Sequence, residues 1–167
     1  IYTTTLLKGV TGSGKTEVYL EAVAECLNNG DQVLVLLPEI ALTSTFIDRV
    51  EERFDSRPAE WHSGISKTEK NRCWKMVASG NAKLVVGARS ALYLPFKNLK
   101  LIVVDEEHDS SYKQEDGILY NARDMAVLRA SLNSASVILA SATPSLETWV
   151  NANDGKYNRL DLTHRYG

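Results

Sequence analysis

The chain reads KGVTGSGKT from Lys8 to Thr16, and this stretch decides how the rest of the sequence is interpreted. From Gly9 onward it matches the pattern G-x-x-x-x-G-K-[ST] at every specified position. A β-prone run at residues 4–7 precedes it, and residues 17–27 follow it with apolar side chains at helical spacing. Strand, glycine-rich loop and helix in this order are the context in which the pattern predicts a phosphate-binding loop.

The chemistry of this loop follows from its backbone and its last two side chains. Glycine has no Cβ, so successive N–H groups can point at a triphosphate without obstruction. The helix that begins there adds unpaired N–H groups and the positive end of its dipole. We expect Lys15 to contact the β- and γ-phosphates and Thr16 to offer a hydroxyl to Mg²⁺. The predicted nucleotide-binding residues are Gly9, Thr11, Gly12, Ser13, Gly14, Lys15 and Thr16.

Length and composition limit the class of protein. A chain of 167 residues is long enough for one domain with a hydrophobic core, and its apolar and charged fractions are ordinary for a soluble globular protein. The net charge of −2 argues against a strongly basic nucleic-acid module, but not against a nucleic-acid site made from a few placed residues. Cys26 and Cys73 lie far apart, so reduced cytosolic thiols are expected rather than a zinc site or disulfide. No membrane span or signal peptide is visible.

The two ends of the sequence suggest that it is part of something larger. The chain begins at Ile1 with a β-prone segment almost at once, and it ends at Gly167 straight after a strand-like run. We therefore expect residues 1–167 to be a single domain excised from a longer protein. Groups that a neighbouring domain supplies would then lie outside this sequence.

Apolar runs alternate with amphipathic segments along the chain. Continuous apolar runs predict parallel strands that are buried on both faces, at residues 32–37, 83–86, 101–104 and 137–140. Helices are expected over residues 45–54, 66–78, 122–132 and 144–150, and a last strand over 159–162. Ser66 and Glu69 form a capping box, and Pro144 suits the first position of a helix. Alternating strands and helices predict an α/β fold with a parallel, doubly wound sheet.

Polar clusters follow the predicted strands, each at the point where a strand ends. They lie at residues 9–16, 38–39, 87–90, 105–108 and 141–143. Ligands of such sheets bind at the carboxyl ends of the strands, which share one edge. We therefore expect these five clusters to form one site.

The acidic run Asp105-Glu106-Glu107-His108 follows the apolar run LIVV directly. An acid at a strand tip beside a phosphate loop is the Mg²⁺-holding position of nucleotide hydrolases. Mg²⁺ keeps most of its waters and takes one or two carboxylates together with phosphate oxygens. Asp105 is the predicted ligand, and Glu106 is expected to point elsewhere and orient the attacking water. Ser141-Ala142-Thr143 follows another buried strand, and its hydroxyls can contact His108 or the carboxylates.

The phosphate loop, Asp-Glu-x-His and Ser-Ala-Thr, in this order and spacing, resemble motifs I, II and III of superfamily 2 helicases. GVTGSGKTEVY, LLPEIALT, HSG, RSAL-x-x-PF, DEEHDSSYKQ, ARD-x-A and SATPS-LET extend the match over nearly the whole chain. Together they resemble the first helicase lobe of the primosomal replication-restart helicases. The resemblance implies a three-layer RecA-like P-loop NTPase domain with a mainly parallel, doubly wound sheet. That family's DNA-binding region, cysteine-rich zinc module, second lobe and carboxyl-terminal domain are not covered by this sequence, so zinc is expected only there.

The resemblance implies roles for the residues that match the nucleotide motifs. Lys15, Asp105, Glu106 and His108 would be catalytic, with ATP as the nucleotide and Mg²⁺ held by Thr16 and Asp105. Ser141 and Thr143 would couple the nucleotide site to DNA.

Further matches imply a path for single-stranded DNA. Pro38, Glu39 and Thr43 match motif Ia, and Arg89 with Ser90 matches motif Ib, in which Ala88 replaces the usual Thr. A translocase that ignores sequence needs only small polar groups and a cation at the phosphodiester backbone. Tyr112 and Lys113 match an aromatic-rich loop that links DNA contact to ATP turnover, and Tyr120 keeps a further ring there, although Ile118 and Leu119 depart from its pattern.

The activity implied by the resemblance is that of the ATP-binding motor lobe of an ATP-dependent 3′-to-5′ DNA helicase that restarts stalled replication forks. The implied partners are single-stranded and forked DNA, a second helicase lobe in the same chain, primosomal proteins and single-stranded-DNA-binding protein, at the nucleoid in the bacterial cytoplasm. Because the arginine finger of such enzymes lies in the second lobe, residues 1–167 alone are expected to hydrolyse ATP very slowly.

Other interpretations of the sequence remain open. The chain is compatible with a different superfamily 2 DNA translocase. A P-loop kinase would share the phosphate loop, but it leaves Asp-Glu-x-His and Ser-Ala-Thr unexplained. A nucleotide-binding interaction module without turnover is disfavoured for the whole protein, because Lys15, Asp105 and Glu106 are intact.

Overall fold

The computed structural model describes residues 3–9, 14–106, 122–141, 146–153 and 155–162. In these ranges the strands are β1 (Thr4–Gly9), β2 (Gln32–Leu36), β3 (Ala59–Trp61), β4 (Leu84–Gly87), β5 (Leu99–Asp105), β6 (Ser136–Ser141) and β7 (Asn158–Leu162). The α-helices are α1 (Lys15–Asn28), α2 (Ser44–Phe54), α3 (Lys67–Ser79), α4 (Ala122–Asn133) and α5 (Leu146–Asn153). Two 3₁₀ turns complete the description, η1 (Glu39–Ala41) and η2 (Arg89–Tyr93).

The seven strands form one sheet in the order β3-β4-β2-β5-β6-β1-β7, and every pairing is parallel. This confirms the predicted doubly wound α/β domain. The strands predicted from apolar runs are all present, within one or two residues of their expected ends. The edge strand β3 was not predicted, because it has only three residues, all half-buried, and therefore lacks an apolar run. Pro144, the expected first residue of the helix at 144–150, lies outside the described residues.

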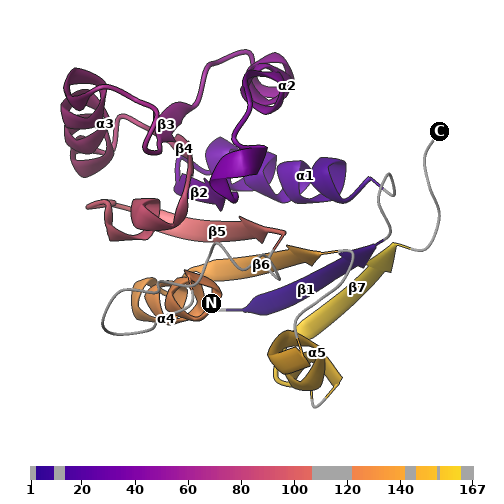
Figure 1. Ribbon diagram of the computed structural model, residues 1–167. Coiled ribbons are helices and arrows are strands. Elements are labelled where there is room, and N and C mark those ends of the chain that lie inside the picture. The colour runs from indigo at the N-terminus through magenta and orange to yellow at the C-terminus, as the bar shows by residue number, and fades with distance from the viewer. Residues whose placement is uncertain (1–2, 10–13, 107–121, 142–145, 154, 163–167) are drawn as a thin grey trace.

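Two hydrophobic layers cover the sheet, one on each face. Val33 and Val35 of β2 pack with α1 and α2, whereas Leu34 and Leu36 of the same strand pack with α3 and α4. Figure 1 shows α1 and α2 on one side of the sheet and α4 on the other. Because both faces are covered, β2 is buried at every position, which explains why its sequence is continuously apolar rather than alternating.

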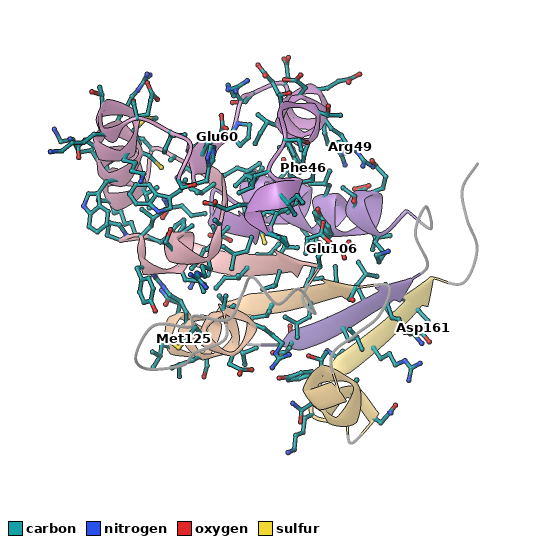
Figure 2. All side chains as sticks on the ribbon, in the orientation of Figure 1. Phe46, Arg49, Glu60, Glu106, Met125 and Asp161 are labelled. Atoms are coloured by element: carbon teal, nitrogen blue, oxygen red, sulfur yellow. The ribbon has the colours of Figure 1, made fainter. Side chains whose placement is uncertain are left out.

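Local signals set the ends of several helices. Ser66 is the N-cap of α3, and its hydroxyl oxygen accepts the Glu69 N–H at 3.1 Å, as the capping box predicts. The helix α3 ends at Gly80, whose φ of 84° lies in the left-handed region that glycine adopts without strain. On the other face, α2 is tied to α1 by ion pairs of Arg49 with Glu17 and of Arg53 with Glu21, and Figure 2 labels Arg49 on α2 beside α1.

The carboxyl ends of the strands share one edge of the sheet. Leu36 at the end of β2 is in register with Gly87 of β4 and Val104 of β5. Farther along, Asp105 pairs with Ala140 of β6. The arrowheads of β5, β6, β1 and β7 accordingly point the same way in Figure 1. The predicted convergence of the polar clusters on one edge therefore agrees with the strand register.

A single buried side chain organises the opposite edge. Gln32 is fully buried, and its amide Nε2 donates to the carbonyls of Val77 at 3.1 Å and Ala82 at 2.8 Å. Its Oε1 accepts the backbone N–H groups of Lys97 at 2.9 Å and Asn98 at 2.8 Å. One amide thus satisfies four backbone groups: one in the last turn of α3, one in the turn before β4 and two in the turn before β5.

We predict that Gln32→Met lowers the free energy of unfolding by about 3 kcal/mol or more, because each buried polar group left without a partner costs about 1–3 kcal/mol. Methionine keeps the volume of glutamine and removes only its hydrogen bonds. Urea denaturation followed by circular dichroism measures the change, with the exposed Asn81→Ala as a control that should stay within about 0.5 kcal/mol. A Gln32→Met protein as stable as the parent would contradict the four-bond arrangement.

Candidate nucleotide site and adjoining groove

The site begins where the predicted phosphate loop meets α1. Gly14 is the N-cap of α1 with φ 90°, a left-handed conformation that favours glycine. The next residue, Lys15, is half-buried, and its ammonium donates to the carbonyl of Gly9 at 2.8 Å. This bond holds the Lys15 ammonium at the end of β1. Thr16 follows in the first turn of the helix, so a cation, a hydroxyl and a helix N-terminus lie together.

Asp105 lies at the carboxyl end of β5 and is 8% exposed. Its Oδ2 accepts the hydroxyl of Tyr19 at 2.7 Å, and its Oδ1 accepts the backbone N–H of Glu106 at 2.8 Å. Tyr19 is fully buried in α1, about one helical turn after Lys15. The Tyr19 hydrogen bond therefore joins the helix that follows the loop to the predicted metal ligand, although the two residues are 86 positions apart.

The electrostatics of this pair follow from its burial. Burial raises the pKa of the Asp105 carboxyl, while the Tyr19 hydrogen bond and the Lys15 charge act to lower it. Burial and the neighbouring carboxylate raise the pKa of Tyr19 well above its usual value, so its hydroxyl remains a donor at neutral pH. The protein thus holds a carboxylate where burial opposes its charge, and a bound cation would relieve that cost. The Asp105 carboxylate and the Thr16 hydroxyl are hard oxygen donors, which fit Mg²⁺.

Glu106 and Ser141 complete the described part of this half of the edge. Glu106 has φ 51°, an unusual conformation for a residue with a Cβ, and such strain typically costs about 1–3 kcal/mol. Figure 2 labels Glu106 between α1 and the end of β5. Ser141 is fully buried at the end of β6 and is in register with Lys8 of β1. Strand β6 therefore lies between the loop strand and the acid strand.

A groove of about 430 Å³ occupies the other half of the same edge. It is lined by residues from the ends of β2, β3 and β4 and from α3: Leu37, Pro38, Glu39, His62, Ser63, Lys70, Ala88, Arg89 and Ser90. Four residues of the predicted DNA path, Pro38, Glu39, Arg89 and Ser90, are among them. Thr43 does not line the groove. It is the N-cap of α2, and its hydroxyl oxygen accepts the Phe46 N–H at 3.2 Å. Its described contact is therefore a helix cap.

One side of the groove is fixed by the Glu39 carboxylate. Its Oε1 accepts the Ser63 backbone N–H at 2.9 Å, and its Oε2 accepts the Ser63 hydroxyl at 2.8 Å. These two bonds hold the pKa of Glu39 below its usual value of 4.5. Glu39 is thus hydrogen-bonded within the protein. The basic side chains in the groove lining are His62, Lys70 and Arg89.

Glycine sets how closely the walls of the groove approach. A Cβ on Gly87 would lie 2.7 Å from the Cβ of Ala91 and 2.8 Å from the carbonyl oxygen of Trp61. Neither atom belongs to a flexible side chain, so only glycine lets the end of β3 and η2 pack against β4 at this distance. A larger cavity of about 940 Å³ lies elsewhere, between α2, α3 and the β3 edge, and neither Lys15 nor Asp105 lines it.

Sequence reasoning missed several residues of the candidate site. Tyr19 was overlooked because a tyrosine in an amphipathic helix carries no signal for a buried hydroxyl contact. His62 and Ser63 were noted only as part of the HSG segment, and Lys70 was not noted at all. His62 and Ser63 belong to the groove because they directly follow β3, and Lys70 because it lies on α3 beside them. The strand β3 itself was too short to be predicted. The roles predicted for Thr11, Gly12, Ser13, His108, Tyr112, Lys113 and Thr143, and the features noted at Ile118, Leu119 and Tyr120, fall outside the described residues.

Comparison with known proteins identifies the class to which this fold and site belong. The pattern that defines the DEAD/DEAH box helicases matches residues 2–151, and the chain belongs to that family. Solved structures agree on the fold: Mss116p bound to ssRNA and AMP-PNP superposes with a TM-score of 0.69 at 11% identity, over 99% of this chain and 33% of that one. The helicase MrfA bound to DNA and AMPPNP gives 0.66 at 19% identity, over 98% of this chain and 25% of that one.

Particular relatives narrow the class. Replication restart protein PriA of Rickettsia felis is 54% identical over 97% of this chain and 25% of its own length. The protein of the same name from Bacillus subtilis is 49% identical over 96% of this chain and 20% of its own length. The resemblance to the primosomal replication-restart helicases is confirmed, and the chain spans a fifth to a quarter of the length of these curated relatives. Within the described residues, no helix is both long and apolar enough to cross a membrane.

We predict that Tyr19→Phe lowers the free energy of unfolding by about 1–3 kcal/mol, because a buried carboxylate loses one of its hydrogen-bond donors. A double-mutant cycle with Asp105→Asn tests whether the two side chains interact directly. The destabilisation caused by Tyr19→Phe should be smaller in the Asp105→Asn protein than in the unsubstituted one. Thermal and urea denaturation of the four proteins measures the coupling. Equal costs in both backgrounds would contradict a direct Tyr19–Asp105 bond.

We predict that the Glu39 carboxyl titrates below 4.5, because both Ser63 bonds favour its charged form. The stability that this lowered pKa contributes is present above about pH 4.5 and is lost as the pH falls through the folded-state pKa. Carboxyl-detected NMR measures the midpoint, which Ser63→Ala should raise part of the way, since the backbone N–H bond remains. An unchanged midpoint in Ser63→Ala would show that the Ser63 hydroxyl does not contact Glu39.

Proposed function

We propose that residues 1–167 are the first motor lobe of an ATP-dependent 3′-to-5′ DNA helicase that acts in the restart of stalled replication forks. The observation that carries the proposal is the Tyr19–Asp105 hydrogen bond of 2.7 Å, since it brings the helix of the phosphate loop and the acid of the DE motif to one place. Family membership and the curated relatives support it, as these are helicases and replication restart proteins.

The proposed chemistry divides among residues at the strand ends. ATP is bound by the loop from Gly9 to Thr16, with the Lys15 cation on its phosphates. Thr16 and Asp105 would hold Mg²⁺, which when bound neutralises charge on the phosphate oxygens. Glu106 orients the attacking water, and its left-handed backbone conformation suits a role distinct from that of Asp105. His108 is assigned the same catalytic centre on the strength of the sequence motif alone.

The groove at the other half of the edge is the proposed path for single-stranded DNA. Arg89 supplies a cation to the phosphodiester backbone, Ser90 and the Pro38–Glu39 turn shape the path, and Thr43 supports it by capping α2. Such contacts carry no sequence information, as a translocase requires. Tyr112 and Lys113 are assigned to the loop that responds to DNA. Ser141 and Thr143 are assigned the coupling of the two sites, and the position of β6 between β1 and β5 supports this for Ser141.

The remainder of the proposal concerns the parent protein. A second helicase lobe in the same chain would close over the nucleotide and supply the arginine finger. Forked DNA, primosomal proteins and single-stranded-DNA-binding protein are the proposed partners, in the bacterial cytoplasm at the nucleoid. The bacterial sources of the relatives, and their roughly four- to fivefold greater length, support this assignment.

We predict that residues 1–167 alone bind ATP·Mg²⁺ and hydrolyse it very slowly, because the missing arginine finger is worth about 10³–10⁵ in rate. Lys15→Ala should abolish nucleotide binding while leaving the melting temperature without ligand nearly unchanged, and Lys156→Ala, an exposed cation on the turn before β7, is the charge-matched control. Titration with a fluorescent ATP analogue and steady-state ATPase assays, beside the full-length parent, provide the measurements. Robust DNA-stimulated turnover by residues 1–167 would overturn the division of labour between lobes.

A further inference from the structure

Two tryptophans lie beside the groove, on the edge strand and the helix that flanks it. Trp61 ends β3 and Trp74 belongs to α3, and their ring centroids are 6.3 Å apart with planes tilted by 46°. The Trp61 Nε1–H donates to the Ser90 hydroxyl oxygen at 3.1 Å, which anchors this pair to the groove wall. Trp74 remains 47% exposed, which is unusual for the largest apolar side chain.

The helix that carries Trp74 is rich in basic side chains. The helix α3 carries four cations, Lys67, Lys70, Arg72 and Lys75, against one acid, Glu69, in a chain whose net charge is −2. Lys67, Lys70 and Trp74 are spaced three and four residues apart, so they share one face of the helix. The Lys70 ammonium lies 6.0 Å from the centroid of the Trp61 ring and also lines the groove. Aromatic rings and cations therefore alternate on one surface that continues from the groove.

This surface has the chemistry of a single-strand platform. Bases stack on exposed aromatic faces whatever their sequence, while cations alongside follow the phosphates. A protein-docking patch would be apolar at its centre and depleted of lysine, which does not describe this one. The continuity through Ser90 and Lys70 indicates that a strand leaving the groove reaches the tryptophans next.

We propose that Trp74, with Trp61 and Lys70, forms a stacking platform that holds bases of single-stranded DNA as the strand leaves the Arg89–Ser90 groove. The inference rests on the proposed function, because it extends the same DNA path. Trp74 supplies the exposed ring, Trp61 supports that ring and is held by Ser90, and Lys70 contacts a phosphate.

The test compares binding of fluorescein-labelled oligothymidylate with that of an abasic oligonucleotide of equal length, which keeps the phosphates and lacks the bases. The chain should prefer oligothymidylate about fivefold or more, the equivalent of one stacked base. Trp74→Ala should remove this preference, and Trp74→Phe should restore most of it. Leu132→Ala, which alters a side chain that is 79% exposed on α4, is the apolar control and should have no effect.

Salt dependence separates the platform from the groove. Lys70→Ala should reduce the slope of log Kd against log salt by about one phosphate contact, and Lys156→Ala should leave it unchanged. Arg89→Ala tests the groove in the same assay. If Arg89→Ala flattens the slope while Trp74→Ala keeps the full preference for oligothymidylate, the platform is wrong and the proposed function stands. If the unsubstituted chain of residues 1–167 binds neither oligonucleotide, both the platform and the proposed function are wrong. A Trp74→Ala protein that changes only its association with other protein chains would also overturn the platform.

Discussion

The hydrogen bond between Tyr19 and Asp105 is the constraint on which the rest of the site depends. It fixes a helix that begins at the phosphate loop against the tip of a strand almost ninety positions later. Because both partners are buried, water competes little for this hydrogen bond, and its length and direction are well defined. The cost of burying the carboxylate is retained in the ligand-free protein and is recovered only when a cation arrives. In the proposed function, binding of a metal–nucleotide complex would offset that cost.

The candidate nucleotide site and the groove lie along one edge of the parallel sheet. The strands β5, β6 and β1 end at the nucleotide side, and β3, β4 and β2 end at the groove. Since β2 and β5 are neighbours, the two sites share a boundary rather than a long path of intermediates. Asp105 ends β5 and Pro38 lies two residues beyond β2, so both are at the ends of strands that are paired to each other.

Much of the fold could be predicted from the sequence, because its signals are strong where burial is complete. The run from Gln32 to Leu37 is apolar at every position but the first, and only a strand covered on both faces requires that. The phosphate loop and the acidic run were found because their residue types are dictated by phosphate and metal chemistry. The remainder depends on tertiary contacts that leave no local pattern. Tyr19 has the pattern of one more residue of an amphipathic helix, and Trp61 ends, and Ser63 follows, a strand too short to detect. The Thr43 hydroxyl caps α2, a contact that the sequence motif did not indicate, and its predicted place in the DNA path stays a prediction.

The buried amide of Gln32 has a mechanical consequence for the opposite edge. By tying the end of α3 and the turns before β4 and β5 to the start of β2, it stiffens the margin of the sheet opposite the candidate site. A sheet that is held at one edge and loaded at the other moves most at the edge that is not held. Strain from ligand exchange would then be concentrated at the edge where the candidate nucleotide site and the groove meet, rather than spread over the whole domain.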